Sequence, residues 1–385
     1  MFSVLRRLNF VSFLSTVALA ACGTVAIYSA GHARERIFYD MWKDNLATVL
    51  FMLVLYFVLA FVDYRKILKW FSIPAYAGAI VLLALVLVFG REIYGGKRWL
   101  WFFQPSEISK LCIIALFAHV FGGWKGRRGF KAFLAAALLA GAPLVLIACE
   151  PDLGTALTLV PALAAMLLAA GVWRTGIVAI MAAAVFAALA VLGAVHEAEK
   201  PNADPVRREK ILNALPLKKH QVKRVKTFLY PDSDPLGDGY TLRQAKISIG
   251  CGGFSGKGIG KGEANRLKFL PPSVSMNDFI FCVWAEETGF VGSAALISLY
   301  AALALSGVWI ALTAADLPGR LLALGFSVLV FAHAGINTAM SVGMLPITGL
   351  PLPLMSSGRT FLVTVLLGLG LVQSVSIHNK TKEKQ

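Results

Sequence analysis

Long runs of apolar residues, separated by short polar segments, dominate the hydropathy pattern of this 385-residue chain. A helix needs about 20 predominantly apolar residues to cross the hydrocarbon core of a bilayer. The runs are continuous, whereas helices of a soluble core are apolar on one face only and barrel strands are half as long and alternate. The pattern therefore predicts about ten spanning helices, near residues 8–30, 46–62, 71–90, 106–122, 132–149, 154–172, 175–195, 284–313, 319–341 and 355–377.

One long polar stretch, residues 196–278, interrupts this pattern. Residues 196–229 are charged and compatible with an amphipathic helix on a membrane surface. Residues 230–242 are dense in turn formers, and residues 243–269 are glycine-rich and basic. We expect an all-α polytopic membrane protein, a single domain over residues 1–385, with one large extracytoplasmic loop between spans seven and eight.

The distribution of positive charge predicts the orientation. An even number of spans puts both termini on one side of the membrane. The short segments on that side carry fourteen basic residues: Arg6, Arg7, Arg65, Lys66, Lys69, Lys125, Arg127, Arg128, Lys131, Arg174, Arg320, Lys380, Lys382 and Lys384. The short loops on the other side carry seven: Arg34, Arg36, Lys43, Arg91, Lys97, Arg98 and Arg359. The positive-inside rule therefore favours cytoplasmic termini and an outward-facing long loop.

Composition agrees with a membrane protein and limits the partners. Hydrophobic residues make up 57% of the chain, and the formal net charge is +16. The long loop carries fifteen Lys and Arg against nine Asp and Glu. Nucleic acid is not expected outside the membrane, so anionic lipid headgroups or a lipid that bears a diphosphate are the expected partners of the loop. The five cysteines lack a C-x-x-C spacing and indicate neither a disulfide framework nor a metal site.

Asp278, the last residue of the long loop, is the first candidate for chemistry. With Asn277 it stands at the expected start of a helix, where either side chain could cap free N–H groups. Alternatively, the carboxylate is a general base at the membrane surface, which accepts the proton of an attacking hydroxyl group. Both interpretations stay open at this stage.

Other charged residues occur in or beside the spans. Glu107 and Lys110 are i, i+3 neighbours that open the fourth span, either as a structural ion pair or as part of a polar cavity. Glu150 and Asp152 occupy the turn before the sixth span and could sit among headgroups, hold a cation, or position Lys110 or Arg98. Glu286 follows Asp278 by eight residues and falls roughly on the same helix face.

The glycine run near residues 250–258 does not match a nucleotide phosphate loop. Gly258 follows Lys257 where that motif requires Ser or Thr, and no strand precedes the run. Its backbone amides and lysines could still hold a diphosphate. The last outer loop, residues 344–359, is rich in Pro and Gly, and we expect it to line a polar cavity or lie at the interface.

Six segments, in order along most of the chain, resemble the SEDS family (shape, elongation, division and sporulation). They are Gly96-Lys97-Arg98-Trp99-Leu100, Gln104-Pro105-Ser106-Glu107 with Lys110, Pro151-Asp152-Leu153-Gly154-Thr155, Ile249-Gly250-Cys251-Gly252-Gly253, Asn277-Asp278-Phe279-Ile280-Phe281 with Ala285-Glu286-Glu287, and Leu345-Pro346-Ile347-Thr348-Gly349-Leu350-Pro351-Leu352-Pro353. Asp234-Pro235-Leu236-Gly237, Lys246 and Gly256-Lys257-Gly258 are more similar to the RodA branch than to the FtsW branch.

The resemblance implies a peptidoglycan glycosyltransferase of the bacterial cytoplasmic (inner) membrane, which polymerises lipid II on the outer face during cell-wall elongation. Its implied partners are a class B penicillin-binding protein, other elongation-complex membrane proteins and membrane lipids. Asp278 matches the family's essential acid. Its implied role is to deprotonate the acceptor 4-hydroxyl group, which then displaces undecaprenyl diphosphate with inversion.

The resemblance also adds residues to the candidate site. It implies no dedicated metal ligands, and it leaves open whether a divalent cation (Mg²⁺ or Mn²⁺) is needed. The expected substrate-binding residues are Arg98, Trp99, Glu107, Lys110, Asp152, Lys246, Lys257 and Glu286. The chain departs from the family pattern at Met276-Asn277, where His-Thr is usual, and at Arg359. A lipid II flippase and a non-catalytic scaffold for the penicillin-binding protein are the alternative functions.

Overall fold

The computed structural model describes residues 7–32, 38, 40–93, 96–101, 103–124, 129–150, 153–200, 204–215, 219–267 and 269–379. Within these residues, nine helices are long and apolar enough to cross a membrane: α2 (Phe10–His32), α4 (Met41–Phe61), α5 (Tyr64–Phe89), α6 (Pro105–Gly122), α7 (Phe130–Cys149), α9 (Arg174–Ala198), α15 (Ile280–Thr313), α16 (Leu317–Ser341) and α17 (Arg359–Ile377). The remaining predicted span, 154–172, is the shorter apolar helix α8 (Leu153–Ala170). The all-α polytopic prediction is therefore confirmed.

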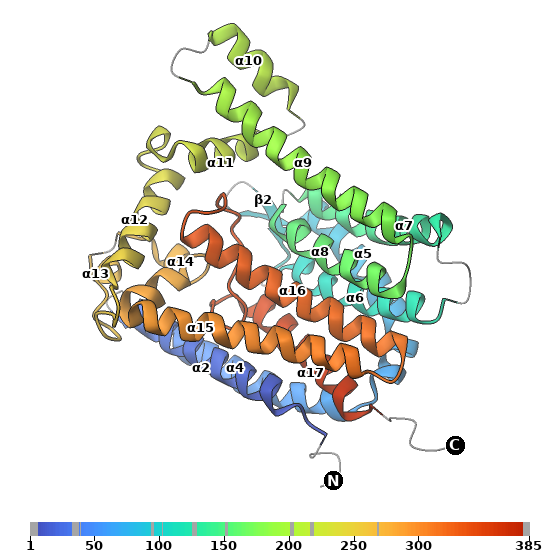
Figure 1. Cartoon of the computed structure of the whole chain (residues 1–385). Helices are drawn as coiled ribbons and strands as arrows, with labels where there is room; N and C mark the ends of the chain where they lie inside the picture. The colour runs from blue at the N-terminus through green and yellow to red at the C-terminus, as the bar shows by residue number, and fades with distance from the viewer. Residues whose placement is uncertain are drawn as a thin grey trace, which may run out of the picture.

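These helices pack into one bundle, in which α17 lies on α4, α15 on α16, and α16 on α8 (Figure 1). Glycine permits the closest approach of α17 to α4, because a Cβ at Gly370 would lie 2.9 Å from the Tyr56 carbonyl oxygen. Helix α9 differs from the rest, since only 6% of the residues in its most apolar stretch are buried inside the protein. Ser376 donates a hydrogen bond to the Arg7 carbonyl, so the start of α2 and the end of α17 lie on the same side.

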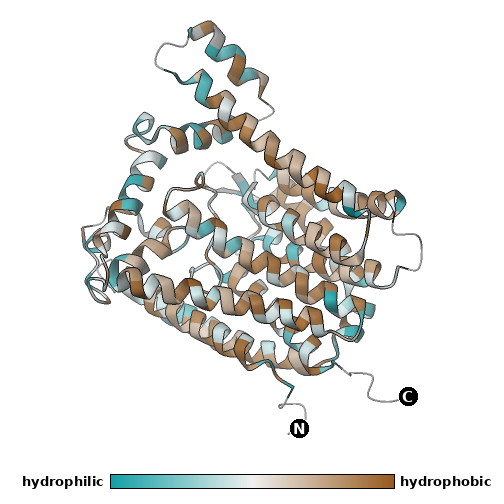
Figure 2. Ribbon diagram, viewed as in Figure 1, coloured by the Kyte–Doolittle hydropathy of each residue, from teal (hydrophilic) through white to brown (hydrophobic). Residues whose placement is uncertain are grey.

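The long loop lies at the end of the bundle away from that side (Figure 1), and it is more polar than the spans (Figure 2). It contains α10 (Pro205–Ala214), α11 (Lys219–Leu229), the 3₁₀ turn η1 (Pro231–Ser233), α12 (Asp238–Cys251), α13 (Glu263–Arg266) and α14 (Pro272–Ser275). The helical prediction for 196–229 is thus confirmed where the structure describes it.

The glycine-rich segment begins later than the sequence indicates. Residues 238–251 form α12, because Leu242, Ala245 and Ser248 share one face and bury it against the bundle. Only the glycines after residue 251 leave the helix, and Gly253, Gly256, Gly258 and Gly260 all have positive φ.

An antiparallel hairpin follows α5, and the hydropathy pattern did not predict it. Strands β1 (Arg91–Ile93) and β2 (Gly96–Trp99) pair with Arg91 opposite Trp99. The hairpin is too short to produce an alternating pattern distinguishable from a polar loop.

The last outer loop, between α16 and α17, runs inside the bundle as irregular backbone. Leu350, Leu352 and Leu354 are at most 2% exposed. Gly23 of α2 packs directly against the backbone of residues 354–355, where a side chain would collide with it. The irregular backbone that we expected at 344–359 is therefore buried at residues 350 and 352–356, where its polar groups need partners within the protein, while Met344 at its start is 72% exposed.

Candidate active site

Asp278 lies just before α15 and does not occupy its capping position. Helix α15 begins at Ile280, with Phe279 as the N-cap residue and no hydrogen bond from that side chain. Asn277 is also outside the cap. The Asp278 side chain is half-buried, and its backbone carbonyl accepts a hydrogen bond of 2.7 Å from Asn337 Nδ2. The N-cap residue of α15 is thus Phe279, and both the structural and the catalytic interpretation of the Asp278 carboxylate stay open.

Asn337 ties the approach to α15 to the last outer loop. Its Nδ2 atom also donates to the Leu350 carbonyl at 2.7 Å, and the side chain is fully buried. One amide on α16 therefore fixes the backbone on both sides of the candidate site. A buried amide that satisfies two carbonyl groups at once is costly to remove, because both acceptors lose their donor.

The departures from the family pattern contact this same loop. Ser357 Oγ donates to Asn277 Oδ1 at 2.6 Å, and Ser356 Oγ donates to the Asn277 carbonyl at 2.6 Å. Met276 packs in the core with 1% exposure. Arg359 pairs with Asp44 at 2.6 Å on the exposed surface, between the first turns of α17 and α4. The hydrogen bonds of Ser356 and Ser357 to Asn277 hold the segment before Asp278 against the loop.

Gly349 of the last outer loop lies beside both Asp278 and Arg224. Its φ of 73° is in the left-handed region that glycine adopts without strain. A Cβ atom here would lie 3.6 Å from Asp278 Oδ2 and 4.0 Å from Arg224 Nη2. Arg224, on α11, also donates from Nη1 to the Thr348 carbonyl at 3.2 Å. The large loop thus contributes a guanidinium group to the surroundings of Asp278.

Lys246 meets the last outer loop at a second glycine. Gly343 has φ 78°, and a side chain there would collide with the end of the Lys246 side chain. Ala245, the residue before Lys246, packs with Phe279, Cys282 and Met340 in a small buried cluster. The predicted residue Lys246 therefore lies beside the loop that also carries Gly349.

Glu107 and Lys110 form an ion pair inside the bundle. Lys110 Nζ lies 2.7 Å from Glu107 Oε2, and the side chains are 0% and 4% exposed. The ammonium group also lies 3.0 Å from His333 Nε2 and 5.1 Å from the centre of the Phe361 ring. The contact between the two side chains is the ion pair that their spacing predicts, a role in a polar cavity stays a prediction, and the structure adds a histidine that the sequence did not single out.

Arg98 connects the hairpin to the end of α7. Its Nε atom donates to the Glu150 carbonyl at 3.3 Å, a contact with the backbone of the turn and not with a carboxylate. Trp99 is half-buried in β2. Asp152 lies outside the described residues. The structure therefore brings Arg98 to the fifth-to-sixth-span turn, while its contact with a substrate stays a prediction.

Lys257 and Glu286 contact each other. Lys257 Nζ lies 2.9 Å from Glu286 Oε1, and this carboxylate also accepts from Ser248 Oγ at 2.9 Å and from the Glu263 N–H at 2.8 Å. The hydrogen bond to Glu286 raises the pKa of Lys257 above its ordinary value. Glu286 is 2% exposed. These contacts anchor the glycine-rich segment, and a direct role of either residue with substrate remains a prediction.

A break in α15 completes this anchor. Gly289 has non-helical angles, φ 65° and ψ −161°, so nearby backbone groups are freed from the helix. Four hydrogen bonds of 2.9 to 3.1 Å use them: Lys257 N to Glu286 O, Gly258 N to Glu287 O, Phe290 N to Gly253 O, and Val291 N to Phe254 O. Ser29 of α2 hydrogen-bonds Glu287 and accepts from the Gly260 N–H. We call residues 252–264 on this break the glycine latch.

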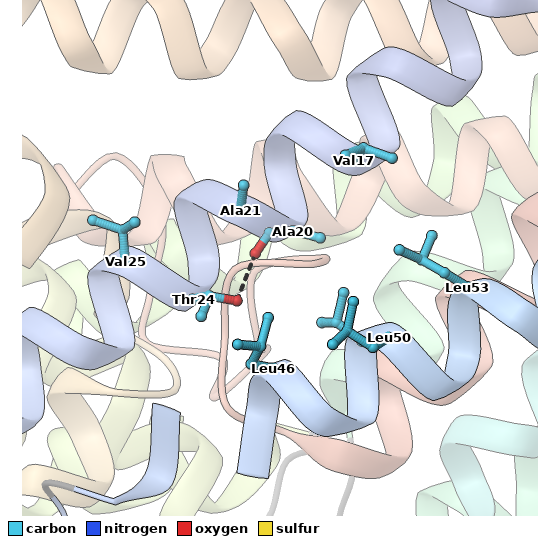
Figure 3. Close-up of a pocket in the computed structure, with 9 residues that line it drawn as sticks. Val17, Ala20, Ala21, Thr24, Val25, Leu46, Leu50 and Leu53 are labelled. Carbon is cyan, nitrogen blue, oxygen red and sulfur yellow. Dashed lines mark hydrogen bonds between the residues drawn. The ribbon is translucent and has the colours of Figure 1, made fainter. Parts of the chain in front are cut away.

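A groove of about 310 Å³ lies elsewhere, between α2 and α4 (Figure 3). Its lining is almost entirely apolar: Val17, Ala20, Ala21, Thr24, Val25, Leu46, Val49, Leu50 and Leu53. The Thr24 hydroxyl donates to the Ala20 carbonyl of its own helix. None of the expected site residues lines this groove, so it is separate from the Asp278 site.

Residues 10–381 match the family model of FtsW, RodA and SpoVE, described as cell cycle proteins. The chain belongs to the FtsW/RodA/SpoVE family. This is the family that the sequence motifs resemble. Among its curated members, the peptidoglycan glycosyltransferase MrdB of Escherichia coli K12 is 34% identical over 376 residues, covering 96% of this chain and 94% of the relative. The peptidoglycan glycosyltransferase RodA of Treponema pallidum is 28% identical, covering 96% and 97%.

Solved family structures have the same fold. A chain from a structure on coordination of polymerization and crosslinking by a peptidoglycan synthase complex superposes with a TM-score of 0.75 at 29% identity, covering 97% of this chain and 99% of that chain. The RodA protein of Thermus thermophilus superposes with a TM-score of 0.66 at 25% identity, covering 97% and 98%. The FtsW/RodA/SpoVE membership and the polytopic helical fold thus rest on both sequence and structure.

Three groups at the site were not singled out from the sequence. Arg224 lies in the charged stretch 196–229, and Asn337 and His333 lie inside an apolar span. A polar residue within a span is itself a signal of function or of a specific partner, and this signal was available for both. Nothing local marks Arg224, because its contact at Thr348 joins residues 124 positions apart.

Proposed function

We propose that the protein is a peptidoglycan glycosyltransferase that polymerises lipid II into glycan strands during cell-wall elongation. The curated relatives named above carry this activity in their names. The observation that carries the proposal is the position of Asp278. Its half-buried carboxylate lies beside Gly349, and the Asn337 amide fixes the backbone at Asp278 and at Leu350.

In the proposed step, Asp278 accepts the proton of the acceptor sugar's 4-hydroxyl group. The freed oxygen forms a bond to the anomeric carbon of the donor. The bond from that carbon to the diphosphate oxygen breaks, and its electron pair leaves with undecaprenyl diphosphate. Attack opposite the leaving group inverts the anomeric centre. A positioned base of this kind contributes about 10²- to 10⁴-fold to a rate.

The leaving diphosphate gains negative charge, which nearby cations stabilise. Lys246 lies against the same loop as Gly349, which supports a role in this step. Arg98 and Trp99 lie in β2 of the hairpin and Lys110 lies inside the bundle, and we propose that they support the site. Lys257, Glu107 and Glu286 are held in ion pairs, so we propose that they shape the site. Asp152 keeps the substrate-binding role that its motif implies.

A divalent cation, Mg²⁺ or Mn²⁺, is a further proposal. Among the described residues, no three His, Cys, Asp or Glu side chains gather as a metal site. Mg²⁺ commonly uses one or two carboxylates and completes its shell with water and substrate phosphates. Diphosphate oxygens and water would hold such an ion, with no dedicated protein ligand. Such an ion would supply positive charge to the leaving group.

The membrane, the orientation and the partners complete the proposed function. We propose a multi-pass protein of the bacterial inner membrane, with both termini cytoplasmic and the Asp278 site facing outward. We further propose a class B penicillin-binding protein as the cross-linking partner, together with elongation-complex proteins and membrane lipids. The similarity to a chain of a peptidoglycan synthase complex supports this partner.

One experiment separates this function from the two alternatives. The protein is reconstituted with its partner in proteoliposomes, and polymer formation and transbilayer movement of lipid II are followed in the same preparation. We expect Asp278→Asn to abolish polymer and to leave any movement of lipid II unchanged. A flippase would show movement without polymer in the wild type. A scaffold would show partner-dependent polymer that survives the substitution.

A further inference from the structure

Arg224 is the residue of α11 that reaches the last outer loop. Its Nη1 atom donates to the Thr348 carbonyl at 3.2 Å, and its side chain is half-buried. The neighbouring cations of α11 are held by acids of the large loop. Lys223 pairs with Asp234 at 3.1 Å, and Lys226 pairs with Glu199 at 3.0 Å. Arg224 makes no ion pair with the described residues, so its charge is available to a ligand.

The second guanidinium nitrogen lies on the Asp278 side of Gly349. A Cβ on Gly349 would lie 4.0 Å from Arg224 Nη2 and 3.6 Å from Asp278 Oδ2. Both groups therefore border the space that a side chain at this position would enter.

The chemistry of a guanidinium group suits a diphosphate. Its N–H donors lie in one plane and can bind two phosphate oxygens side by side, with one donor still on a carbonyl group. The Thr348 bond orients this plane relative to the loop. A lysine at the same position would supply charge without the paired geometry.

We propose that Arg224 binds the diphosphate of the donor lipid beside Gly349 and the carboxylate of Asp278. This inference deepens the proposed function and rests on it. When the anomeric carbon–oxygen bond breaks, the electron pair moves onto the diphosphate oxygen, and Arg224 stabilises that added charge while Asp278 holds the proton from the acceptor. The large loop thereby supplies a substrate-binding residue of the active site.

The experiment measures lipid II polymerisation by the full-length protein with its partner, and inhibition by inorganic pyrophosphate. The variants are Arg224→Gln and Arg224→Lys, with Lys223→Gln as the matched control one residue away on α11. We expect Arg224→Gln to lower kcat/KM by about 10- to 100-fold, as for loss of a charged hydrogen bond. The inhibition constant of pyrophosphate should rise by a similar factor. Arg224→Lys should recover part of both, and Lys223→Gln should match the wild type.

A purely structural role gives a different result. If Arg224→Gln only loosens the loop, its melting temperature and kcat fall while the inhibition constant of pyrophosphate stays within twofold of the wild type. That outcome overturns the proposal. So does an equal effect of Lys223→Gln on pyrophosphate inhibition.

A binding measurement separates this inference from the proposed base. In the Asp278→Asn background, binding of lipid II to the protein is measured with and without Arg224→Gln. Weaker binding in the double variant supports the role of Arg224 whether or not Asp278 is the base. Equal binding of the two proteins contradicts it, while persistent polymerisation by Asp278→Asn contradicts the proposed base alone.

Discussion

Lys110 Nζ lies 2.7 Å from Glu107 Oε2 at the start of α6, and the bundle encloses both side chains almost completely. Helix α6 is predominantly apolar, so both charges of this pair lie in a low-dielectric interior. The ammonium group is further surrounded by His333 Nε2 and the Phe361 ring. The charge of Lys110 is thus compensated within the protein.

Removing one partner of this pair should destabilise the bundle. We expect Glu107→Gln to lower the free energy of unfolding by about 3 to 5 kcal/mol, because a buried ammonium group loses its counter-charge. Thermal unfolding in detergent measures the change. Asp40→Asn, which removes the partner of the exposed Lys43, is the control and should cost about 0 to 1 kcal/mol. Equal shifts for the two variants would mean that the buried pair is not a stability element.

His333 should act as the second acceptor for Lys110. We expect His333→Leu to cost about 1 to 3 kcal/mol, since the ammonium group loses a hydrogen-bond partner. His333→Gln keeps an acceptor and should cost less. The ratio of the two melting shifts checks this. A smaller loss for Leu than for Gln would show that the contact contributes nothing.

The glycine latch should open when Glu286 is lost. Its carboxylate accepts from Ser248, Lys257 and two backbone N–H groups, at Glu263 and Ala264. We expect Glu286→Ala to increase hydrogen exchange of residues 252–264 by at least about tenfold, because several charge-assisted hydrogen bonds break together. The control is Glu263→Ala, whose side chain is 61% exposed and pairs only with Lys257 at 3.3 Å. Unchanged exchange in Glu286→Ala contradicts the latch.

The latch should also depend on pH in one direction. Hydrogen bonding to Glu286 raises the pKa of Lys257 in the folded protein, so folding favours the protonated form. This stabilisation is complete below the unfolded pKa, about 10.4, and is lost as pH rises through the folded pKa. We expect the difference in melting temperature between wild type and Lys257→Met to be constant near neutral pH and to shrink above about pH 10.4. A difference that grows with alkaline pH would contradict the assignment.

The spans were predictable because bilayer thickness dictates the length of apolar runs, and among the described spans α8 is the short one. The place of Asp278 just before a helix and the pairing of Glu107 with Lys110 were also predictable, the first from the apolar run that follows and the second from the i, i+3 spacing. The site around Asp278 was not. Gly349 and Arg224 meet only after α11 and the last outer loop fold against each other, and no local pattern encodes that contact.

The glycine latch shows the same limit. The run after residue 251 was recognisable as flexible backbone, but its partners are the carbonyl and N–H groups freed at Gly289. Gly289 lies inside the predicted span 284–313, and hydropathy does not distinguish a broken helix from a continuous one. The start of α12 at Asp238 was missed because glycine and turn residues flank a helical face that only its packing against the bundle reveals.

Asp278 is the residue on which the proposed activity depends most. The most direct measurement is the rate of glycan polymer formation from lipid II by the purified protein with its partner. We predict that Asp278→Asn lowers this rate by about 10²-fold or more, as expected for loss of a general base, while melting temperature and partner binding stay at the wild-type values. A folded Asp278→Asn protein that polymerises lipid II at the wild-type rate would contradict the central claim.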